Sequence, residues 1–545
     1  MTVGPFDRGT SLAALADETF DVLVIGGGIT GAGVALDAAS RGLRTALVEK
    51  GDFASGTSSK SSKLVHGGLR YLQQGDIRLV YEALRERQRL LRNAPHLVDV
   101  LPFLIPMFGK DGVIHPKLAR ALGSAMWMYD LTGGARIGKL HKRISAEETM
   151  AHMPTLPPGR VAASYLYYDA QADDARLTMT IARTAAVLHG AVCVNHAPVV
   201  ELLRRGVHVQ GAVVEAHGRR IGVRARQVVN ATGVWADEVR TLDEGRDPDT
   251  IRPAKGIHLT VPWSLVQNDI AVVAPVPKDK RSVFVVPWSA PGGEPEFTYI
   301  GTTDTDYDGP LDDPQCTPDD VDYLVRAINH STTTEITRAD VLGTWAGLRP
   351  LVKSTGDGRT ADLSRRHSVT ASRSGMITVT GGKLTTYREM AADTVDAVAK
   401  RLDLPRSQRR SRTKKLRLLG AQGFDSEAAG RRAHLHGRFG GDSSLIEAMI
   451  GRDPSLGEPL VPGLPYLRAE AVYSARYEMA ATLDDVLSRR TRSLLLGRDA
   501  AAAVADEVAD LVGDELGWDE ATRKREVDAF RAKAAAERDP LDLVP

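Results

Sequence analysis

The segment VIGGGITGAG, at residues 24–33, constrains the fold more than any other part of the chain. It follows an apolar strand predicted over residues 21–25 and precedes a helix predicted over about 29–41. A second strand is predicted over residues 45–49, and this β-turn-α-β order requires a parallel sheet with a right-handed crossover. The glycines have the G-x-G-x-x-G spacing that is typical of a dinucleotide-binding turn.

Each glycine of this turn has its own physical task. Gly26 permits the tight turn, Gly28 lets a pyrophosphate approach the backbone, and Gly31 allows the helix to pack closely on the strand. The helix N-terminus offers free N–H groups and the positive end of its dipole to the phosphates. Glu49, at the end of the second strand, is placed to accept hydrogen bonds from ribose hydroxyls. This acid favours an unphosphorylated ribose and leaves both NAD and FAD open.

Two later segments favour FAD. NATGVWAD, at residues 230–237, reads as a strand that ends in a turn of small residues. TGGKLTTYR, at residues 380–388, reads as another strand followed by a turn and a helix. The N-terminus of that helix, near residues 382–386, is placed to direct its dipole at the electron-rich end of a reduced isoalloxazine. An NAD enzyme does not need a closing segment so far downstream.

Length and composition limit the other possibilities. At 545 residues the chain is too long for one ordinary core, so two or three domains are expected. The net charge of +1 gives no reason to expect a nucleic-acid partner. Two cysteines without a CxxC pair, and no HExxH spacing, predict no disulfide framework and no metal, and they fit the cytoplasm. No run of about 20 apolar residues occurs, so a transmembrane helix is not expected.

Similar strands far apart in the sequence indicate a discontinuous nucleotide domain. Strands predicted over 227–231 and 376–380 each precede a glycine turn, as the first strand does. We predict an α/β protein in three parts. These are an FAD-binding domain (residues 18–96, 170–250 and 341–404), an antiparallel substrate domain (97–169 and 251–340) and a C-terminal helical domain (405–545).

Longer motifs carry a resemblance to a known family. They are GTSSKSSKLVHGGLRYL (56–72), NATGVW (230–235), KGIHLTVP (255–262), VVPW (285–288), IGTTDTDY (300–307), AGLRPL (346–351) and GGKLTTYR (381–388). In this order they resemble FAD-dependent, quinone-linked glycerol-3-phosphate dehydrogenase, and residues 471–492 are similar to that family's C-terminal domain. The resemblance implies a Rossmann-type FAD domain like those of glutathione reductase and the amino-acid oxidases, a β-rich substrate domain and an all-α cap.

The resemblance also implies an activity and a set of site residues. The activity is oxidation of sn-glycerol 3-phosphate to dihydroxyacetone phosphate by hydride transfer from C2 to FAD, with the electrons passed to a membrane quinone. The implied catalytic residues are His258, Arg349 and Lys383, and the implied substrate-binding residues are Arg70, Tyr71, Thr303 and Arg365. The cofactor positions are Gly26, Gly28, Gly31, Glu49, Thr57, Ser58, Ser59, Ser61, Lys63, Leu64, His66, Gly67, Gly68, Ala231, Gly233, Gly381, Gly382, Leu384, Thr385 and Thr386.

Oxidation of a secondary alcohol requires a hydride acceptor and a base for the hydroxyl proton. We hypothesise that His258 accepts this proton, directly or through a water, because an unperturbed imidazole pKa of ~6.5 suits a base near neutral pH. Arg349, in a stiff turn before Pro350, would stabilise the developing alkoxide. Arginine forks and the Lys383 point charge suit a phosphate ester.

Residues 97–108 and 121–129 are apolar, with Lys110, Lys117 and Arg120 between them. Two interpretations stay open: a segment that rests among lipid headgroups, or the core of the substrate domain. The first, together with the resemblance, predicts peripheral attachment to the inner face of the cell membrane. The cap is a candidate for homodimer formation or another partner contact.

Three other functions stay open. The chain is alternatively a glycerol-3-phosphate oxidase that passes electrons to O2, an amine-oxidising flavoprotein of the amino-acid-oxidase type, or a flavin-binding protein without turnover. Cationic residues from several segments argue against the second, because an amino acid needs only one carboxylate clamp. The intact set of catalytic candidates argues against the third.

Overall fold

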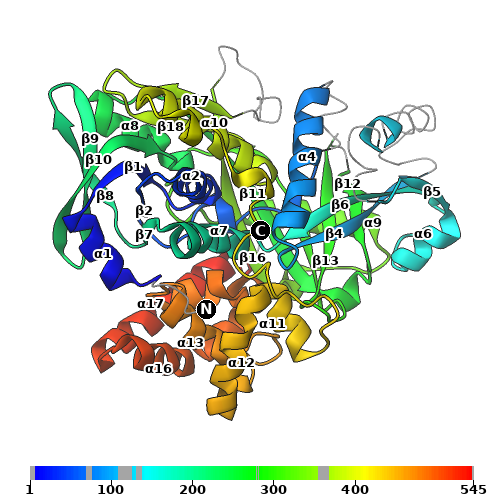
Figure 1. Ribbon diagram of the computed structural model, residues 1–545. Coiled ribbons are helices and arrows are strands. Elements are labelled where there is room, and N and C mark those ends of the chain that lie inside the picture. Colours follow the sequence, from blue (N-terminus) through cyan, green and yellow to red (C-terminus); the bar gives the residue numbers. More distant parts are fainter. Residues whose placement is uncertain are drawn as a thin grey trace.

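The computed structural model describes residues 6–68, 76–108, 126–130, 138–277, 279, 281–353 and 367–542. Two β-sheets lie side by side, and the C-terminal helices cover one end of the molecule (Figure 1). In the N-terminal three quarters of the chain the helices are α1 (Arg8–Asp17), α2 (Ile29–Ser40), α4 (Ile77–Asn93), α6 (Ala146–His152), α7 (Asp174–His189), α8 (Ala236–Glu244), α9 (Pro318–Ser331) and α10 (Tyr387–Arg401).

The first sheet carries the glycine turn. Its strands are β1 (Thr19–Ile25), β2 (Thr45–Val48), β7 (Val192–Val194), β8 (Val199–Arg205), β9 (His208–Ala216), β10 (Arg219–Asn230), β17 (Ser368–Ala371) and β18 (Ile377–Thr380). The main order is β17-β18-β10-β1-β2-β7, and β1 is parallel to both β2 and β10. The four strands predicted from separate parts of the sequence therefore lie in one sheet, and the predicted α/β class is confirmed.

The helix α2 joins β1 to β2 and packs against α7 and α10. Apart from Asp37 its residues are small or apolar, and eleven of its twelve residues are buried. Val24, Ala35, Leu177 and Val395 are fully buried members of the core that these elements share. This packing fixes the N-terminus of α2 against the ends of β1 and β10, which is where a nucleotide is expected.

The second sheet has ten strands. They are β3 (Leu64–Val65), β4 (Val98–Phe108), β5 (Lys142–Ser145), β6 (Val161–Ala172), β11 (Ile251–Pro262), β12 (Ala271–Pro275), β13 (Ser282–Trp288), β14 (Phe297–Gly301), β15 (Thr305–Asp306) and β16 (Gly343–Val352). All named pairs are antiparallel except β4 with β12. β16 lies on β11 throughout residues 343–352, so this strand, which the predicted boundaries assign to the FAD domain, belongs to the substrate sheet.

The apolar segment 97–108 is a core strand and does not lie at the surface. β4 runs between β12 and β6, and Phe103, Leu104 and Ile105 are buried. The interpretation of this segment as lying among headgroups is therefore wrong, and the core interpretation is right. Trp127 and Met128 are exposed, at 56% and 41%, whereas Lys110, Lys117 and Arg120 lie outside the described residues. No helix in the described part of the chain is long and apolar enough to cross a bilayer.

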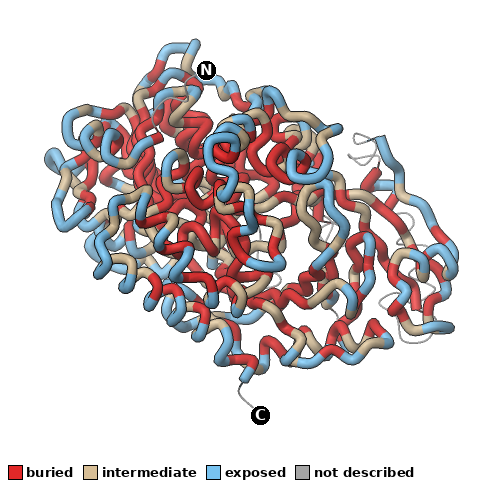
Figure 2. Tube along the Cα trace, turned by 90° about the horizontal axis from the view of Figure 1, so that it is seen from below, coloured by how far each residue is buried: buried red, intermediate tan, exposed pale blue. Residues whose placement is uncertain are grey.

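The C-terminal region is helical, as predicted. It contains α11 (Arg431–Phe439), α12 (Ser443–Arg452), α13 (Arg468–Tyr477), α14 (Ser493–Leu496), α15 (Arg498–Ala503), α16 (Ala505–Leu516) and α17 (Glu520–Asp542). Its residues Leu495 and Phe530 share a core with Phe103 and Trp345 of the substrate sheet. Buried residues fill the interior of the molecule (Figure 2). Because one core contains residues of both, the cap and the substrate sheet are packed as one unit.

Candidate active site

The glycine turn after β1 has the geometry that its spacing predicts. Gly26 has a φ of +107°, and a Cβ there would lie 2.7 Å from the carbonyl oxygen of Ala231. A Cβ on Gly31 would lie 1.8 Å from the carbonyl oxygen of Gly26. A Cβ on Gly28 would lie 3.1 Å from the Ser58 hydroxyl. The backbone is therefore packed too closely at Gly31 and Gly26 for any side chain.

Glu49 fixes the turn from the end of β2. Its carboxylate accepts hydrogen bonds from the N–H groups of Gly27, at 2.6 Å, and Gly51, at 2.8 Å. Burial raises the pKa of Glu49, and these two donors partly offset the shift. The first N–H of α2, that of Ile29, donates to the Ser58 hydroxyl at 2.9 Å. This N–H is thus already bonded, in contrast to the free N–H groups that we expect from the sequence.

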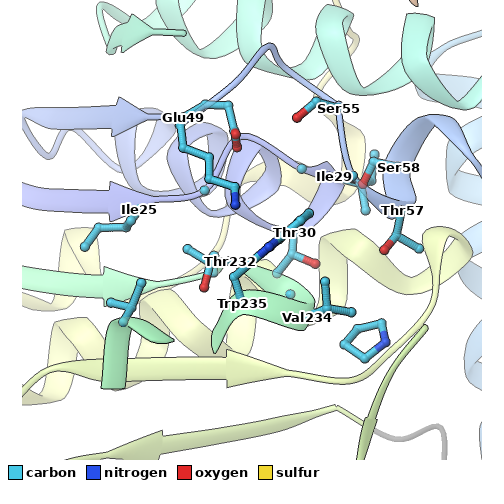
Figure 3. A pocket seen from close by; sticks show the side chains of 18 of the residues that line it. Ile25, Ile29, Thr30, Glu49, Ser55, Thr57, Ser58, Thr232, Val234 and Trp235 are labelled. Carbon is cyan, nitrogen blue, oxygen red and sulfur yellow. Dashed lines mark hydrogen bonds between the residues drawn. The ribbon is translucent and has the colours of Figure 1, made fainter. Parts of the chain in front are cut away.

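A cavity of about 370 Å³ opens beside this turn. Figure 3 shows Glu49, Ser58 and Trp235 around it, contributed by three different segments. Predicted residues that line the cavity are Gly26, Gly28, Glu49, Thr57, Ser58, Ala231, Gly233, Gly381, Gly382, Lys383 and Leu384. The structure therefore brings the glycine turn and the two later segments that favour FAD to one site.

The segment from Gly56 to Gly68 runs from this cavity toward the second sheet. The Thr57 hydroxyl donates to the carbonyl of Leu348 at 2.5 Å, and the Ser59 hydroxyl lies 3.5 Å from the Gly56 carbonyl. Ser61 donates to Asp174 through both its N–H and its hydroxyl, at 3.0 and 2.7 Å. These bonds tie the segment to β16 and to the start of α7.

Lys63 is buried in this segment and paired with Asp174. Its Nζ lies 3.1 Å from Asp174 Oδ1 and 4.8 Å from the centre of the Trp345 ring. Burial, followed by the positive charge of Arg492, lowers the pKa of Lys63 to about 8. The cation is therefore easily deprotonated for a lysine, although a carboxylate lies beside it.

The remaining predicted cofactor residues meet where β3 approaches the helix after β18. The His66 N–H donates to the Thr385 hydroxyl at 3.1 Å, and Leu64 is buried in β3. Gly67 N–H donates to Tyr129 and Asp169, and Gly68 has a φ of +77°. Thr385 and Thr386 lie in a 3₁₀ turn, Leu384–Thr386, that precedes α10. Leu64, His66, Gly67 and Gly68 belong to the segment, and Thr385 contacts it. None of these residues, nor Thr386, lines the cavity.

His258 is buried on β11, only 2% exposed. Its ring stacks on Trp345, with centroids 4.7 Å apart and planes 6° from parallel. Nε2 lies 2.8 Å from the Ser62 hydroxyl, and Nδ1 has no hydrogen-bond partner among the described residues. Burial, then the charges of Lys63 and Arg349, hold the pKa of His258 well below 6.5. The expectation of an unperturbed pKa is therefore wrong, and the imidazole is neutral at pH 7.

Arg349 lies on the neighbouring strand β16, opposite Ala254, and its charge reaches His258. Its guanidinium contacts Asp304 Oδ1 at 3.0 Å, the Thr302 hydroxyl at 3.2 Å and the Thr303 carbonyl at 3.2 Å. The Thr303 hydroxyl accepts from the Ile257 N–H at 3.1 Å, so Thr303 is itself fixed to β11. Arg349 and Thr303 are thus brought together beside His258, as the resemblance implies.

Three predicted substrate residues, Arg70, Tyr71 and Arg365, lie outside the described residues. Lys383 is described, and it precedes the 3₁₀ turn and lines the cavity. His258, Arg349 and Thr303 do not line the cavity. The structure therefore gives two connected clusters, one at the nucleotide cavity and one at β11 and β16.

Sequence reasoning missed four residues that complete these clusters: Ser62, Asp174, Trp235 and Trp345. Ser62, Trp235 and Trp345 lie within or beside the motifs that we quote, so position in a motif is a signal that could have found them. Asp174 has no such signal, because an acid at the start of a helix usually serves as a cap.

Asp52, His196 and Asp485 place three potential metal-ligand atoms within 4.8 Å of one another. Asp52 already accepts from Arg489 at 2.7 Å and from Arg490 at 2.6 Å. Asp485 also accepts from Arg489, at 2.6 Å. Two guanidinium groups therefore supply the positive charge that a metal ion would bring.

Comparison with known proteins gives consistent matches. A model of the FAD-dependent oxidoreductase family matches residues 21–388, and a model of the C-terminal domain of alpha-glycerophosphate oxidase matches residues 411–523. Glycerol-3-phosphate dehydrogenase 2 of Mycobacterium bovis is 41% identical over 98% of this chain and 91% of its own. The human mitochondrial glycerol-3-phosphate dehydrogenase is 37% identical, over 97% of this chain and 75% of its own.

Solved structures agree with these matches. The crystal structure of glycerol-3-phosphate dehydrogenase from Bacillus halodurans, complexed with FAD, superposes with a TM-score of 0.76 at 30% identity, covering 98% of this chain and 99% of that one. L-α-glycerophosphate oxidase from Mycoplasma pneumoniae shares the fold, with a TM-score of 0.55 at 18% identity over 70% of this chain and 95% of its own.

Proposed function

The chain belongs to the family of FAD-dependent glycerol-3-phosphate dehydrogenases, and from that premise we propose that it oxidises sn-glycerol 3-phosphate to dihydroxyacetone phosphate, with the C2 hydride passing to FAD and the electrons passing on to a membrane quinone. The observation that carries the proposal is the 41% identity, over 98% of the chain, to a relative of that name. The neutral, buried His258 beside Arg349 supports it, because these groups suit removal of a hydroxyl proton.

The described residues fit FAD. The close approach of Gly31 to Gly26 leaves backbone rather than side chains facing the cavity, as a pyrophosphate requires. The Glu49 carboxylate lines the same cavity and is placed for a ribose. Bound there, FAD would supply the two-electron acceptor of the oxidation. The residues that would hold it are Gly26, Gly28, Glu49, Thr57, Ser58, Gly381 and Gly382.

His258 is the proposed base. A neutral imidazole has one ring nitrogen that accepts a proton, and which one is set by the hydrogen bond of the other. We assign Nε2–H as the donor to Ser62, so that Nδ1 takes the proton of the C2 hydroxyl, directly or through a water. The stacked Trp345 ring holds the imidazole plane in place.

Arg349 has two proposed tasks. Its contacts with Asp304 and Thr303 hold the guanidinium in a fixed orientation, which is the condition for stabilising a developing alkoxide without reorganisation. Its charge also keeps His258 neutral, since it is one of the causes of the lowered pKa. We propose that Lys383 binds the phosphate of the substrate, and the resemblance implies the same role for Arg70 and Arg365, which lie outside the described residues.

The deciding experiment is an anaerobic flavin spectrum of the purified protein. We expect bleaching near the flavin absorption maximum on addition of glycerol 3-phosphate, fast reoxidation by a quinone analogue and slow reoxidation in air. Absence of bleaching with this substrate would contradict the proposed reaction. Glycerol without the phosphate is the matched control, and it should bleach the flavin far more slowly if cations bind the phosphate.

An oxidase is the second candidate. The observation that favours it is the match of residues 411–523 to a C-terminal domain described for alpha-glycerophosphate oxidase. The same spectrum separates the two, because reoxidation by air as fast as by the quinone analogue would assign an oxidase.

Peripheral attachment to the inner face of the membrane is part of the proposal. Exposed Trp127 and Met128, two residues suited to a bilayer interface, support it. Flotation with anionic vesicles at low salt, and release at high salt, is the expected result. Failure to float at low salt would remove the membrane from the proposal and leave the oxidation step intact.

A further inference from the structure

The C-terminal helical region reaches the segment from Ser59 to Lys63, referred to below as segment 59–63. Within this segment the Ser62 hydroxyl contacts His258, and the carbonyls on either side of it are also held. The Ser61 carbonyl accepts from Trp345 Nε1 at 3.2 Å, and the Ser62 carbonyl accepts from the Tyr299 hydroxyl at 3.0 Å. The position of the Ser62 hydroxyl therefore depends on how the whole segment is anchored.

Asp174 is the main anchor of segment 59–63 on the other side. It is the first residue of α7 and is fully buried. It accepts hydrogen bonds from the N–H and hydroxyl of Ser61 and from Nζ of Lys63. A buried carboxylate is stable in its charged form only when cations lie beside it. Asp174 therefore needs a cationic partner in order to keep Ser61 and Lys63 in place.

Arg492 completes this arrangement from the C-terminal region. This arginine is 2% exposed and precedes α14. Its guanidinium donates to Asp174 and to the carbonyl of Ser59, the latter at 3.2 Å, and its Nε lies 3.1 Å from Asp173. One side chain, 318 residues from Asp174 in sequence, thus contacts both the anchor and the segment itself.

We propose that Arg492 is a positioning residue for the oxidation, which acts through Asp174 and segment 59–63 to hold Ser62 against His258. This inference rests on the proposed function, because His258 is the base of that reaction. It also gives the C-terminal region a task in the active site besides its packing on the substrate sheet. Arg492 itself does not need to touch the substrate.

The charges around Lys63 give the proposal an electrostatic signature. The groups that face Lys63 are Asp173, Asp174, Arg492 and the ring of Trp345. After burial, Arg492 is the largest cause of its lowered pKa, and Lys63 in turn is one of the causes that lower the pKa of His258. Removal of the Arg492 charge should therefore raise the pKa of Lys63 from about 8.

Arg489 provides a matched control. It is another buried arginine of the C-terminal region, 7% exposed, and it bridges to the nucleotide domain through Asp52 at 2.7 Å. Its other hydrogen bonds go to Asp484 and Asp485, within its own region. Arg489→Gln therefore breaks a comparable pair between the same two parts of the molecule without touching segment 59–63.

The experiment compares Arg492→Gln with Arg489→Gln as holoenzymes. For Arg492→Gln we expect a flavin-reduction rate at saturating glycerol 3-phosphate that is at least about tenfold lower, since small misplacements of a base are costly. Because the charge of Lys63 lowers the pKa of His258, the titration of Lys63 should appear in the pH profile of this rate as a transition near pH 8, and in Arg492→Gln we expect this transition to move up by about half a unit or more. Amide exchange in the peptide that contains residues 59–63 should be faster. Arg489→Gln should lower the melting temperature but keep the wild-type rate and profile.

Equal rates and pH profiles for the two variants would overturn the inference. If Arg492→Gln does not fold, Arg492→Lys is tested in its place. A lysine keeps the charge but, as a single point charge, cannot contact Asp173 through a second nitrogen while it binds Asp174 and the Ser59 carbonyl, as the guanidinium does. We expect about threefold slower reduction or more, and a wild-type rate would overturn the inference. Failure of the proposed function looks different, because wild-type flavin would then not bleach at all.

Discussion

The nucleotide cavity and the cluster around His258 are built by opposite means. At the cavity the site is made mainly of backbone. Gly26 and Gly31 are packed so closely that no side chain fits, and the Glu49 carboxylate accepts hydrogen bonds from two backbone N–H groups. Around His258 the chain presents side chains from distant segments, with Trp345 stacked on the ring and Ser62 bonded to it.

This difference has a physical consequence. A site made of backbone depends on local conformation, which glycine spacing and a β-turn-α unit specify within about thirty residues. A site made of buried, charged side chains depends on mutual balance, since every charge needs its partner after desolvation. A substitution should therefore impair the nucleotide cavity mainly by a steric clash. A substitution in the cluster around His258 should impair it by displacing a side chain or by leaving a charge without its partner.

Substitution of His258 by Gln is expected to have the largest effect. It removes the proposed base but keeps a polar side chain of similar size, so FAD should remain bound while flavin reduction falls by about 10²–10⁴-fold. Stopped-flow reduction by glycerol 3-phosphate under anaerobic conditions measures this. An unchanged rate and pH profile would remove His258 from the mechanism and would break the contrast between the two clusters.

The same substitution tests the pKa of His258. Because the folded pKa lies well below the unfolded value of ~6.5, the unfolded chain binds more protons just below pH 6.5. The contribution of His258 to stability is therefore present above pH 6.5 and is lost as the pH falls. Urea unfolding from pH 7.5 to 5.5 should show a smaller loss of stability in His258→Gln than in the wild type. Equal slopes would contradict the lowered pKa.

Substitution of Gly31 by Ala tests the backbone-built site. Its Cβ would lie 1.8 Å from the Gly26 carbonyl oxygen, so the turn must move. Such overpacking costs about 3 kcal/mol, and we expect FAD affinity to fall by about 100-fold. Gly451→Ala is the matched control in helix α12, where a Cβ has no atom within 4 Å, and it should bind FAD normally. Stoichiometric FAD in Gly31→Ala would contradict the steric argument.

The contrast also explains what the sequence predicts and what it does not. The turn, the helix after it and the cavity lining follow from local patterns such as VIGGGITGAG and GGKL, and the structure places them together. The lowered pKa of His258 does not follow, because it arises from burial and from Lys63 and Arg349, which other segments contribute. The core position of residues 97–108 likewise depends on tertiary packing, because an apolar strand has the same sequence pattern at a membrane interface and inside a sheet.

Substitution of Glu49 by Gln should have a smaller effect than Gly31→Ala. The carboxylate of Glu49 accepts from the N–H groups of both Gly27 and Gly51. A Gln amide has only one acceptor oxygen, so one of these two N–H groups would face the NH2 group and lose its acceptor. Loss of a charge-assisted hydrogen bond of about 1.5 kcal/mol predicts FAD binding weaker by about tenfold. Glu215→Gln, at an exposed position of β9, is the control for a simple change of net charge. Equal FAD affinity in the two variants would show that the backbone holds the cofactor without this acid.

Substitution of Ser62 by Ala sharpens the comparison at its finest point, a single hydroxyl 2.8 Å from Nε2 of His258. The ring keeps its stack on Trp345, so the base stays in place but loses the bond that selects its tautomer. A net hydrogen bond of about 1 kcal/mol predicts flavin reduction about fivefold slower, with unchanged FAD content. Tyr299→Phe, which removes only the donor to the Ser62 carbonyl, should slow reduction less, because Trp345 and Asp174 still hold the segment on either side. If Tyr299→Phe proved the slower of the two, the backbone position of the segment, and not the Ser62 hydroxyl, would orient His258. The cluster around His258 would then depend on backbone conformation, as the glycine turn does.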